Sequence, residues 1–259
     1  MSSSDLNLGV FADLHCGHVL GLVPPKWFVK KNLYPEVYKL QRKSWEYFVE
    51  GVDMAGPYDM VVWNGDVVDG LQPKGEATDL ITHEPREQID IACEIVKYIN
   101  APVNVFVSGT GYHTKVARFN FEKEVAARFG CKAEPEVMIN ANGKSFYFRH
   151  KIDGSSVPYG NHTPLAKMQL NQFIKASAGK APKADILVFS HTHKFGGAYG
   201  DGWEALTTPC LQINSNHGRM TCNGDTTWGF IWFNVQEDGN YTLGKYTKNI
   251  STPMKMVTI

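Results

Sequence analysis

The sequence predicts an α/β fold, because short apolar runs alternate with segments of helical periodicity. Strands are expected at residues 6–11, 60–63, 103–107, 145–148 and 186–189. Helices are expected at about residues 35–54, 84–99, 119–129 and 164–178. Repeated strand and helix units of this kind form a sheet with helices packed on its faces.

The predicted helix at 84–99 shows the local signals most clearly. Thr82 is a candidate N-cap, and Pro85 falls in the first turn, where its missing N–H group costs nothing. Ile89, Cys93 and Val96 form an apolar stripe along one side. The sequence therefore predicts an amphipathic helix that packs on the sheet.

The chain becomes β-rich after about residue 195. Gly, Asn, Thr and Trp dominate there, and the stretches WGFIWFNV and GNYTLGKYT alternate as hairpin strands do. No linker separates this part from the rest. We therefore expect a single domain over residues 1–259, in which 1–195 form a βα core and 196–259 add a sheet.

Composition excludes several classes of protein. The 259 residues are 43% hydrophobic, and 26 basic side chains balance 26 acidic ones, so no global charge favours nucleic acid or an anionic membrane. No apolar run approaches the roughly 18 residues that span a bilayer, and the first residues lack a signal-peptide pattern. Five scattered cysteines without a Cys-x-x-Cys pair indicate reduced thiols. We expect a soluble cytoplasmic protein that binds no membrane.

Each of the five expected strands is followed by aspartate or histidine. The residues concerned are Asp13, His15, Asp66, His113, His150, His191 and His193. Side chains two residues apart on a strand point to the same face, so the Asp-x-His and His-x-His pairs could each bind one metal ion. In open α/β sheets the ligand site lies beyond the carboxyl ends of the strands, so the five ends can meet in one crevice. Aspartate and histidine without cysteine suit Mn, Fe or Zn.

These motifs resemble the calcineurin-like metallophosphoesterase family. The family has five blocks in order, and here they read Asp13-Leu14-His15, Gly65-Asp66-Val67-Val68-Asp69, an altered third block that ends at His113, then His150, and Ser190-His191-Thr192-His193. The resemblance extends from residue 6 to residue 194. It implies a four-layer α-β-β-α sandwich of two mixed β-sheets flanked by helices.

The resemblance also implies a dinuclear metal site. Asp13, His15 and His193 would bind one divalent ion, His150 and His191 would bind the other, and Asp66 would bridge them. Mn is the expected metal, with Fe, Zn and Ni as alternatives. A hydroxide between the ions would attack phosphorus, and His113 would act as the general acid.

The third block departs from the family pattern. Gly-Asn-His is replaced by Gly109-Thr110-Gly111-Tyr112-His113, so the amide that binds the second metal is missing and Thr110 is the expected substitute. The acid that usually follows the histidine is replaced by Thr114. Gly160-Asn161-His162 spells the missing motif, but no strand-like run precedes it, so we prefer the block at 109–113.

Other residues could line the site or support it. Asp69 is expected to orient a ligand rather than bind metal. His18 could face the substrate or lie in a turn, and His217 and Arg219 could contact a phosphate or lie in a solvated loop. Two inserts, 16–35 and 70–82, are expected to rim the site and to select the substrate. They contribute aromatic and basic side chains that could bind a base and a phosphate, Trp27, Phe28, Tyr34, Lys26, Lys30, Lys31 and Lys74.

These observations favour a dinuclear metal-dependent phosphoesterase that acts on a phosphodiester. The alternatives are a phosphomonoesterase or a nucleotide pyrophosphatase and, in a different class, a binding or scaffold protein that keeps the fold with little turnover. The expected partner is a phosphate-ester substrate, with nucleotides and nucleic acid as candidates. The loop Asp13-Leu14-His15-Cys16-Gly17-His18 resembles phage- or prophage-type members of the family.

Overall fold

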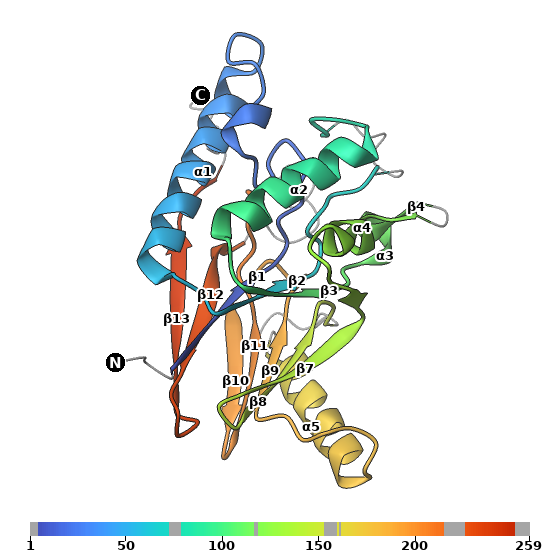
Figure 1. Ribbon diagram of the computed structural model, residues 1–259, viewed down its shortest axis with the longest axis vertical. Helices are drawn as coiled ribbons and strands as arrows, with labels where there is room; N and C mark the ends of the chain where they lie inside the picture. The colour runs from blue at the N-terminus through green and yellow to red at the C-terminus, as the bar shows by residue number, and fades with distance from the viewer. Residues whose placement is uncertain are drawn as a thin grey trace, which may run out of the picture.

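Two mixed β-sheets lie face to face, and helices cover their outer faces (Figure 1). The computed structural model describes residues 5–72, 79–116, 119–152, 160, 162–214 and 226–251. The larger sheet has six strands in the order β13-β12-β1-β2-β3-β6, and the smaller has five in the order β10-β11-β9-β8-β7. Strands β4 and β5 form a small hairpin of their own.

The strands of the larger sheet are β1 (Leu6–Phe11), β2 (Met60–Asn64), β3 (Val103–Val107), β6 (Ala133–Glu134), β12 (Trp228–Val235) and β13 (Tyr241–Lys248). The strands of the smaller sheet are β7 (Glu136–Ala141), β8 (Lys144–Arg149), β9 (Ile186–Phe189), β10 (Gly196–Gly200) and β11 (Trp203–Thr207). The hairpin consists of β4 (Lys115–Val116) and β5 (Phe119–Asn120). β1, β2 and β3 run parallel to one another, and so do β8 and β9.

Alternation of side chains along the strands produces the layers. In β1, Val10 points into the core between the sheets, whereas the next residue, Phe11, joins the core beneath the helices. In β9, Val188 lies between the sheets and Phe189 faces outward toward α5. Since successive side chains point to opposite faces, strands that are apolar throughout must be covered on both sides.

The helices occupy the two outer layers. α1 (Pro35–Ala55), α2 (Pro85–Ile99) and α4 (Phe121–Arg128) pack on the larger sheet, whereas α5 (Thr163–Ser177) packs on the smaller one. Two short elements complete the set, the 3-10 helix η1 (Pro25–Trp27) and α3 (Gly111–Thr114). The predicted four-layer α-β-β-α arrangement is therefore confirmed.

Several sequence predictions need correction. Thr82 is not the N-cap of α2: Glu84 occupies that position, and the Thr82 hydroxyl accepts the Glu84 N–H at 3.1 Å. The chain after residue 195 does not add a separate sheet, because β10 and β11 join the smaller sheet while β12 and β13 join the larger. The predicted hairpin of β12 and β13 is confirmed. Six of the described strands, β4, β5, β6, β7, β10 and β11, are not predicted from the sequence, and β5 lies where the helix at 119–129 is expected to begin.

None of the helices in the described ranges is long and apolar enough to cross a membrane. A cytoplasmic location stays a prediction. Cys16, Cys93, Cys131 and Cys210 are free thiols, as expected, and Cys222 lies outside the described residues.

Candidate metal centre

The aspartates and histidines that follow five strands come together where the two sheets meet. Asp13, Asp66 and His113 follow strands of the larger sheet, whereas His150 and the His191/His193 pair follow strands of the smaller one. These residues thus lie at strand ends of two facing sheets rather than at the edge of one open sheet. Loop-to-loop hydrogen bonds hold these ends, since the Asp13 N–H donates to Gly65 O at 3.0 Å and the Ser190 N–H to His150 O at 2.8 Å.

One group, the first cluster, consists of Asp13, His15 and His193. One ligand atom from each lies within 4.8 Å of the others. His193 Nε2 is 3.2 Å from Asp13 Oδ1, and the Nε2 atoms of His15 and His193 face each other at 3.3 Å. Ring nitrogens and a carboxylate oxygen that converge in this way can bind a divalent cation.

A second group, the second cluster, consists of Asp66, His150 and His191, whose ligand atoms also lie within 4.8 Å of one another. His150 Nε2 is 3.0 Å from Asp66 Oδ2, and His191 Nδ1 is 4.0 Å from the same oxygen. The clusters adjoin, because His150 Nε2 is also 3.9 Å from Asp13 Oδ1. The Thr110 hydroxyl lies 3.2 Å from each Asp66 oxygen, at the edge of this cluster.

The backbone at these positions adopts a conformation that side chains rarely allow. Asp13, His15, Asp66, His191 and His193 have positive φ angles of 51°, 48°, 49°, 72° and 56°. Among the described residues they make up five of the eight non-glycine residues with positive φ. Such conformations cost on the order of 1–3 kcal/mol each and cluster at functional sites. Their concentration here indicates that the loops are shaped to aim these side chains.

Two glycines allow the ligand loops to approach each other. A Cβ at Gly65, where φ is +85°, would lie 2.4 Å from the ring of His150. A Cβ at Gly109 would lie 2.1 Å from Asp66 Oδ1. The Gly-Asp motif and the first glycine of the third block are thus required by the packing of the second cluster.

Hydrogen bonds donated by Nδ1 orient three of the histidines. His15 Nδ1 donates to Asp69 Oδ1 at 2.9 Å, and His150 Nδ1 donates to Asn64 O at 2.8 Å. His113 Nδ1 donates to Asp69 O at 2.7 Å. Because each acceptor is an oxygen without a proton, Nδ1 carries the hydrogen and Nε2 is directed toward the centre.

The charges of the two clusters balance each other. Burial acts to raise the pKa of Asp13, but His193 and His150 lower it below its usual value. Burial likewise opposes ionisation of Asp66, yet His150 holds the pKa of that carboxyl well below normal. Burial acts to lower the pKa of His150, and Asp66 and Asp13 outweigh it and raise the pKa to about 9. Without a metal ion, protons on the histidines therefore neutralise the two carboxylates.

The residues fit a pair of divalent cations. Asp13 Oδ1 is fully buried and faces three imidazole Nε2 atoms, that of His193 at 3.2 Å and those of His15 and His150 at 3.9 Å. A cation would satisfy this oxygen and replace the proton that keeps the facing Nε2 atoms of His15 and His193 together. Carboxylate, imidazole and hydroxyl groups are the donors that Mn, Fe and Zn accept. Metal binding by these residues stays a prediction.

His113 lies beside the first cluster and has an orienting carboxylate. Its ring centroid is 4.7 Å from that of His15, and its side chain is 20% exposed. Besides the bond to the Asp69 carbonyl, Nδ1 is 3.5 Å from Asp69 Oδ1. Asp69 therefore takes the place that the altered third block left open, and one residue orients both His15 and His113.

Several other candidates lie elsewhere or serve the fold. His18 is buried, and its Nδ1 accepts the N–H of Leu20 at 2.8 Å, so it closes a turn. His162 precedes α5 and belongs to neither cluster. Trp27 packs against the helix-side core. The candidates that lie outside the described residues are Lys74, Asn161, His217 and Arg219.

Four supporting residues were not predicted from the sequence. Asn64 Nδ2 donates to Ser190 Oγ at 2.7 Å and so ties the ends of β2 and β9 together. Cys210 is buried beside His193. Burial acts to lower the pKa of His193, but Cys210 and Asp13 outweigh it and raise that pKa well above its usual value. Glu122 is a fully buried carboxyl next to the second cluster. Among these, only Ser190 stood in a recognised block.

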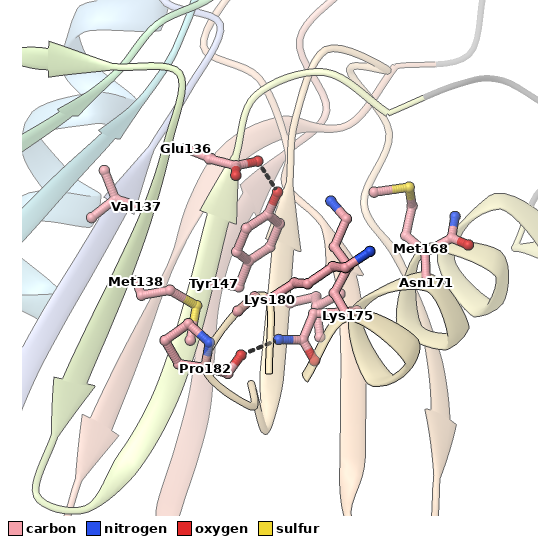
Figure 2. Close-up of a pocket in the computed structure, with 12 residues that line it drawn as sticks. Glu136, Val137, Met138, Tyr147, Met168, Asn171, Lys175, Lys180 and Pro182 are labelled. Atoms are coloured by element: carbon pink, nitrogen blue, oxygen red, sulfur yellow. Dashed lines mark hydrogen bonds between the residues drawn. The ribbon is translucent and has the colours of Figure 1, made fainter. Parts of the chain in front are cut away.

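A separate hollow lies on the outer face of the smaller sheet. It has a volume of about 260 Å³ and lies between α5 and strands β7 and β8. Figure 2 shows its apolar side chains Met138, Tyr147 and Met168 and its basic side chains Lys175 and Lys180. Among its described lining residues there is no member of either cluster. The candidate metal centre is therefore not this hollow.

Comparisons with known proteins add structural likeness alone. No family model and no curated protein sequence matches this chain. A single-mutant Vps29 from Entamoeba histolytica is 16% identical with a TM-score of 0.46, and the alignment covers 94% of this chain and 100% of that one. Vps29 from Chaetomium thermophilum is 12% identical with a TM-score of 0.48, covering 96% and 99%. A predicted phosphoesterase from Streptococcus pneumoniae is 10% identical with a TM-score of 0.37, covering 94% and 98%. At this level of similarity the matches assign no function to the chain.

Proposed function

We propose that this protein is a dinuclear metal-dependent phosphoesterase of the calcineurin-like type. The observation that carries the proposal is the pair of adjoining clusters, each with one buried aspartate and two histidines, with Asp66 and Asp13 at their border. Divalent ions in such a site, when bound, activate water at neutral pH and neutralise charge on a phosphoryl group. Mn is the metal we propose first, with Fe, Zn and Ni as alternatives.

Other steps of the reaction are assigned to residues of the chain itself. The clusters orient the phosphate, since their carboxylates and imidazoles fix where positive charge is held. His113 Nδ1 donates to the Asp69 carbonyl, so Nε2 is the nitrogen that, when it carries a proton, would transfer it to the leaving oxygen. Asp69 accepts from His15 through its carboxylate and from His113 through its carbonyl, and so orients both rings. Thr110 keeps Asp66 in place through its N–H, which donates to Oδ1 at 2.7 Å.

A phosphodiester is the substrate class we propose. Among the described residues, no lysine or arginine nitrogen lies within 4.0 Å of the carboxylates of Asp13, Asp66 or Asp69. A monoester dianion carries one more negative charge than a diester, and no lysine or arginine of the described residues pairs with these carboxylates. Nucleotides and nucleic acid are the phosphodiesters that we would test first, and a phage-type origin stays part of this proposal.

Metal analysis together with two model substrates tests the proposal. Purified protein should bind about two divalent ions and, with added Mn²⁺, hydrolyse bis-p-nitrophenyl phosphate faster than p-nitrophenyl phosphate. A chelator should abolish turnover, and Mn²⁺ should restore it. Less than about half an equivalent of metal together with no turnover of either substrate would contradict the enzyme and favour a binding or scaffold protein. Faster turnover of the monoester would overturn only the diester preference.

A further inference from the structure

Behind the second cluster lies a buried carboxylate that the chemistry above does not use. Glu122 is in the first turn of α4 and is fully buried. Its Oε1 accepts the N–H of Val67 at 3.0 Å, and its Oε2 accepts the N–H of Gly109 at 2.5 Å. Asn120 caps the same helix by accepting the Lys123 N–H at 3.0 Å. Glu122 is thus anchored by a short, capped helix and contacts two separate loops.

The two N–H groups belong to neighbours of candidate ligands. Val67 follows Asp66, and Gly109 precedes Thr110. Thr110 in turn contacts Asp66 through both its N–H and its hydroxyl. The carboxylate of Glu122 therefore closes a ring of contacts around the ends of β2 and β3. A shift of this carboxylate would displace Asp66 and Thr110 together.

Burying an ionisable carboxyl group at this position costs free energy, which argues against a role in packing alone. Burial first, and then the nearby charge of Asp66, raise the pKa of Glu122 to about 7. Its helix neighbours Phe121 and Val125 are apolar and equally buried. An apolar side chain at this position would leave the buried N–H groups of Val67 and Gly109 without their acceptor. An ionisable side chain here is explained by the two N–H groups that it orients.

We propose that Glu122 is a positioning residue that holds Asp66 and Thr110 in the geometry required by the ion of the second cluster. The inference rests on the proposed dinuclear centre. It predicts that the two ions respond differently when Glu122 is changed. The first cluster has its own support in Asp69 and does not contact the Glu122 carboxylate through any hydrogen bond among the described residues.

The test is calorimetric titration of the metal-free protein with Mn²⁺, for wild type, Glu122→Gln and Glu124→Gln. Glu124 is the matched control, because it lies in the first turn of the same helix but is exposed. In the Glu122→Gln variant we expect one of the two ions to bind about 10- to 100-fold more weakly. The other ion would share Asp66 but would also be held by Asp13, His15 and His193, so it should weaken by no more than about threefold, and the control should match wild type at both sites.

Thermal unfolding of the metal-free proteins separates positioning from a merely structural role. Gln keeps one accepting oxygen but places an NH2 group against the other N–H, so the metal-free variant should unfold cooperatively at a slightly lower temperature than wild type. Equal weakening of both ions together with a large drop in unfolding temperature would overturn the positioning role. If Glu122→Gln does not fold, Glu122→Asp keeps the charge but withdraws it from the two N–H groups, and it should weaken the same single ion.

The outcomes distinguish this inference from the proposed function. A wild-type protein that binds two ions, with a Glu122→Gln variant that binds both equally well, would overturn the role of Glu122 and leave the dinuclear centre intact. A wild-type protein that does not bind two ions would overturn the centre and the role of Glu122 with it.

Discussion

The first cluster is more enclosed than the second, although each contains one aspartate and two histidines. In the first, the side chains of Asp13, His15 and His193 are 0%, 3% and 21% exposed. In the second, His191 is 37% exposed, and the ligand proposed to complete the cluster is the hydroxyl of Thr110, which lies 3.2 Å from each Asp66 oxygen. A neutral hydroxyl is a weaker metal ligand than an amide oxygen or a carboxylate. For the proposed dinuclear centre, this difference predicts that the ion of the first cluster is bound more tightly than the ion of the second.

The largest expected effect comes from Asp66, which belongs to the weaker cluster but adjoins both. Asp66→Asn removes negative charge from the border of the two clusters. Loss of several kcal/mol of metal-based charge stabilisation corresponds to a decrease of about a thousandfold or more in kcat/KM. Hydrolysis of bis-p-nitrophenyl phosphate measures it, with Asp53→Asn on the exposed face of α1 as control. A variant within about tenfold of wild type would contradict the role of Asp66 in joining the clusters.

A second effect concerns His113, which lies on the side of the first cluster. His113→Gln removes the proton donor but leaves Asp13, His15 and His193 in place. We expect kcat to fall about 100-fold on diesters with poor leaving groups. On p-nitrophenyl esters, whose leaving group needs little protonation, the fall should be much smaller. His83→Gln, at an exposed position, is the control. An equal loss on both kinds of substrate would show that His113 binds rather than protonates.

Metal affinity should depend on pH at both clusters, because the pKa values of His193 in the first and His150 in the second are both raised. The pKa of His150 is raised to about 9 in the metal-free protein, so the ring holds a proton at pH 7 that a metal ion must displace. Affinity should therefore rise with pH, by up to about tenfold per unit for one displaced proton, and level off above about pH 9. Calorimetry in buffers of different ionisation enthalpy counts the protons released. No proton release at pH 7 would contradict this arrangement.

The smallest expected effect is a gain rather than a loss. Thr110→Asn supplies the amide oxygen that the third block lacks, and it should tighten the second ion by about five- to tenfold, a change of about 1 kcal/mol. Thr110→Val, which keeps the shape but removes the hydroxyl, should weaken the same ion. Both ions can be followed by the titration described for Glu122. If Thr110→Asn tightened neither ion, Thr110 would not lie at the position of the missing ligand.

Much of the fold could be predicted because its central strands are buried on both faces. Continuous apolar runs such as that of β9 mark strands without ambiguity when turn residues bound them. β10 could not be predicted, because Gly196–Gly200 is rich in glycine and the strand is half exposed. The division of strands between two sheets is not encoded locally either. β12 pairs with β1, which is more than 200 residues away.

The candidate ligands were predictable because their blocks combine residue type with spacing. Their supporting residues were not, since each acts through an atom that sequence spacing does not reveal. Glu122 lies in a charged stretch, FEKE, and only the fold shows that it, and not Glu124, is buried. Cys210 lies beside His193 because backbone hydrogen bonds bring distant parts of the chain together there. Asp69 was expected to orient one ligand, and the structure shows that it orients two histidines.

Anomalous diffraction from crystals grown with Mn²⁺ tests the central claim most directly, because it locates metal without relying on activity. The account predicts two peaks about 3.5–4 Å apart, one between Asp13, His15 and His193 and the other between Asp66, His150 and His191. The second peak should be the weaker and should disappear first as Mn²⁺ is lowered. No peak at either cluster at saturating Mn²⁺, or peaks only elsewhere on the chain, would contradict the dinuclear centre.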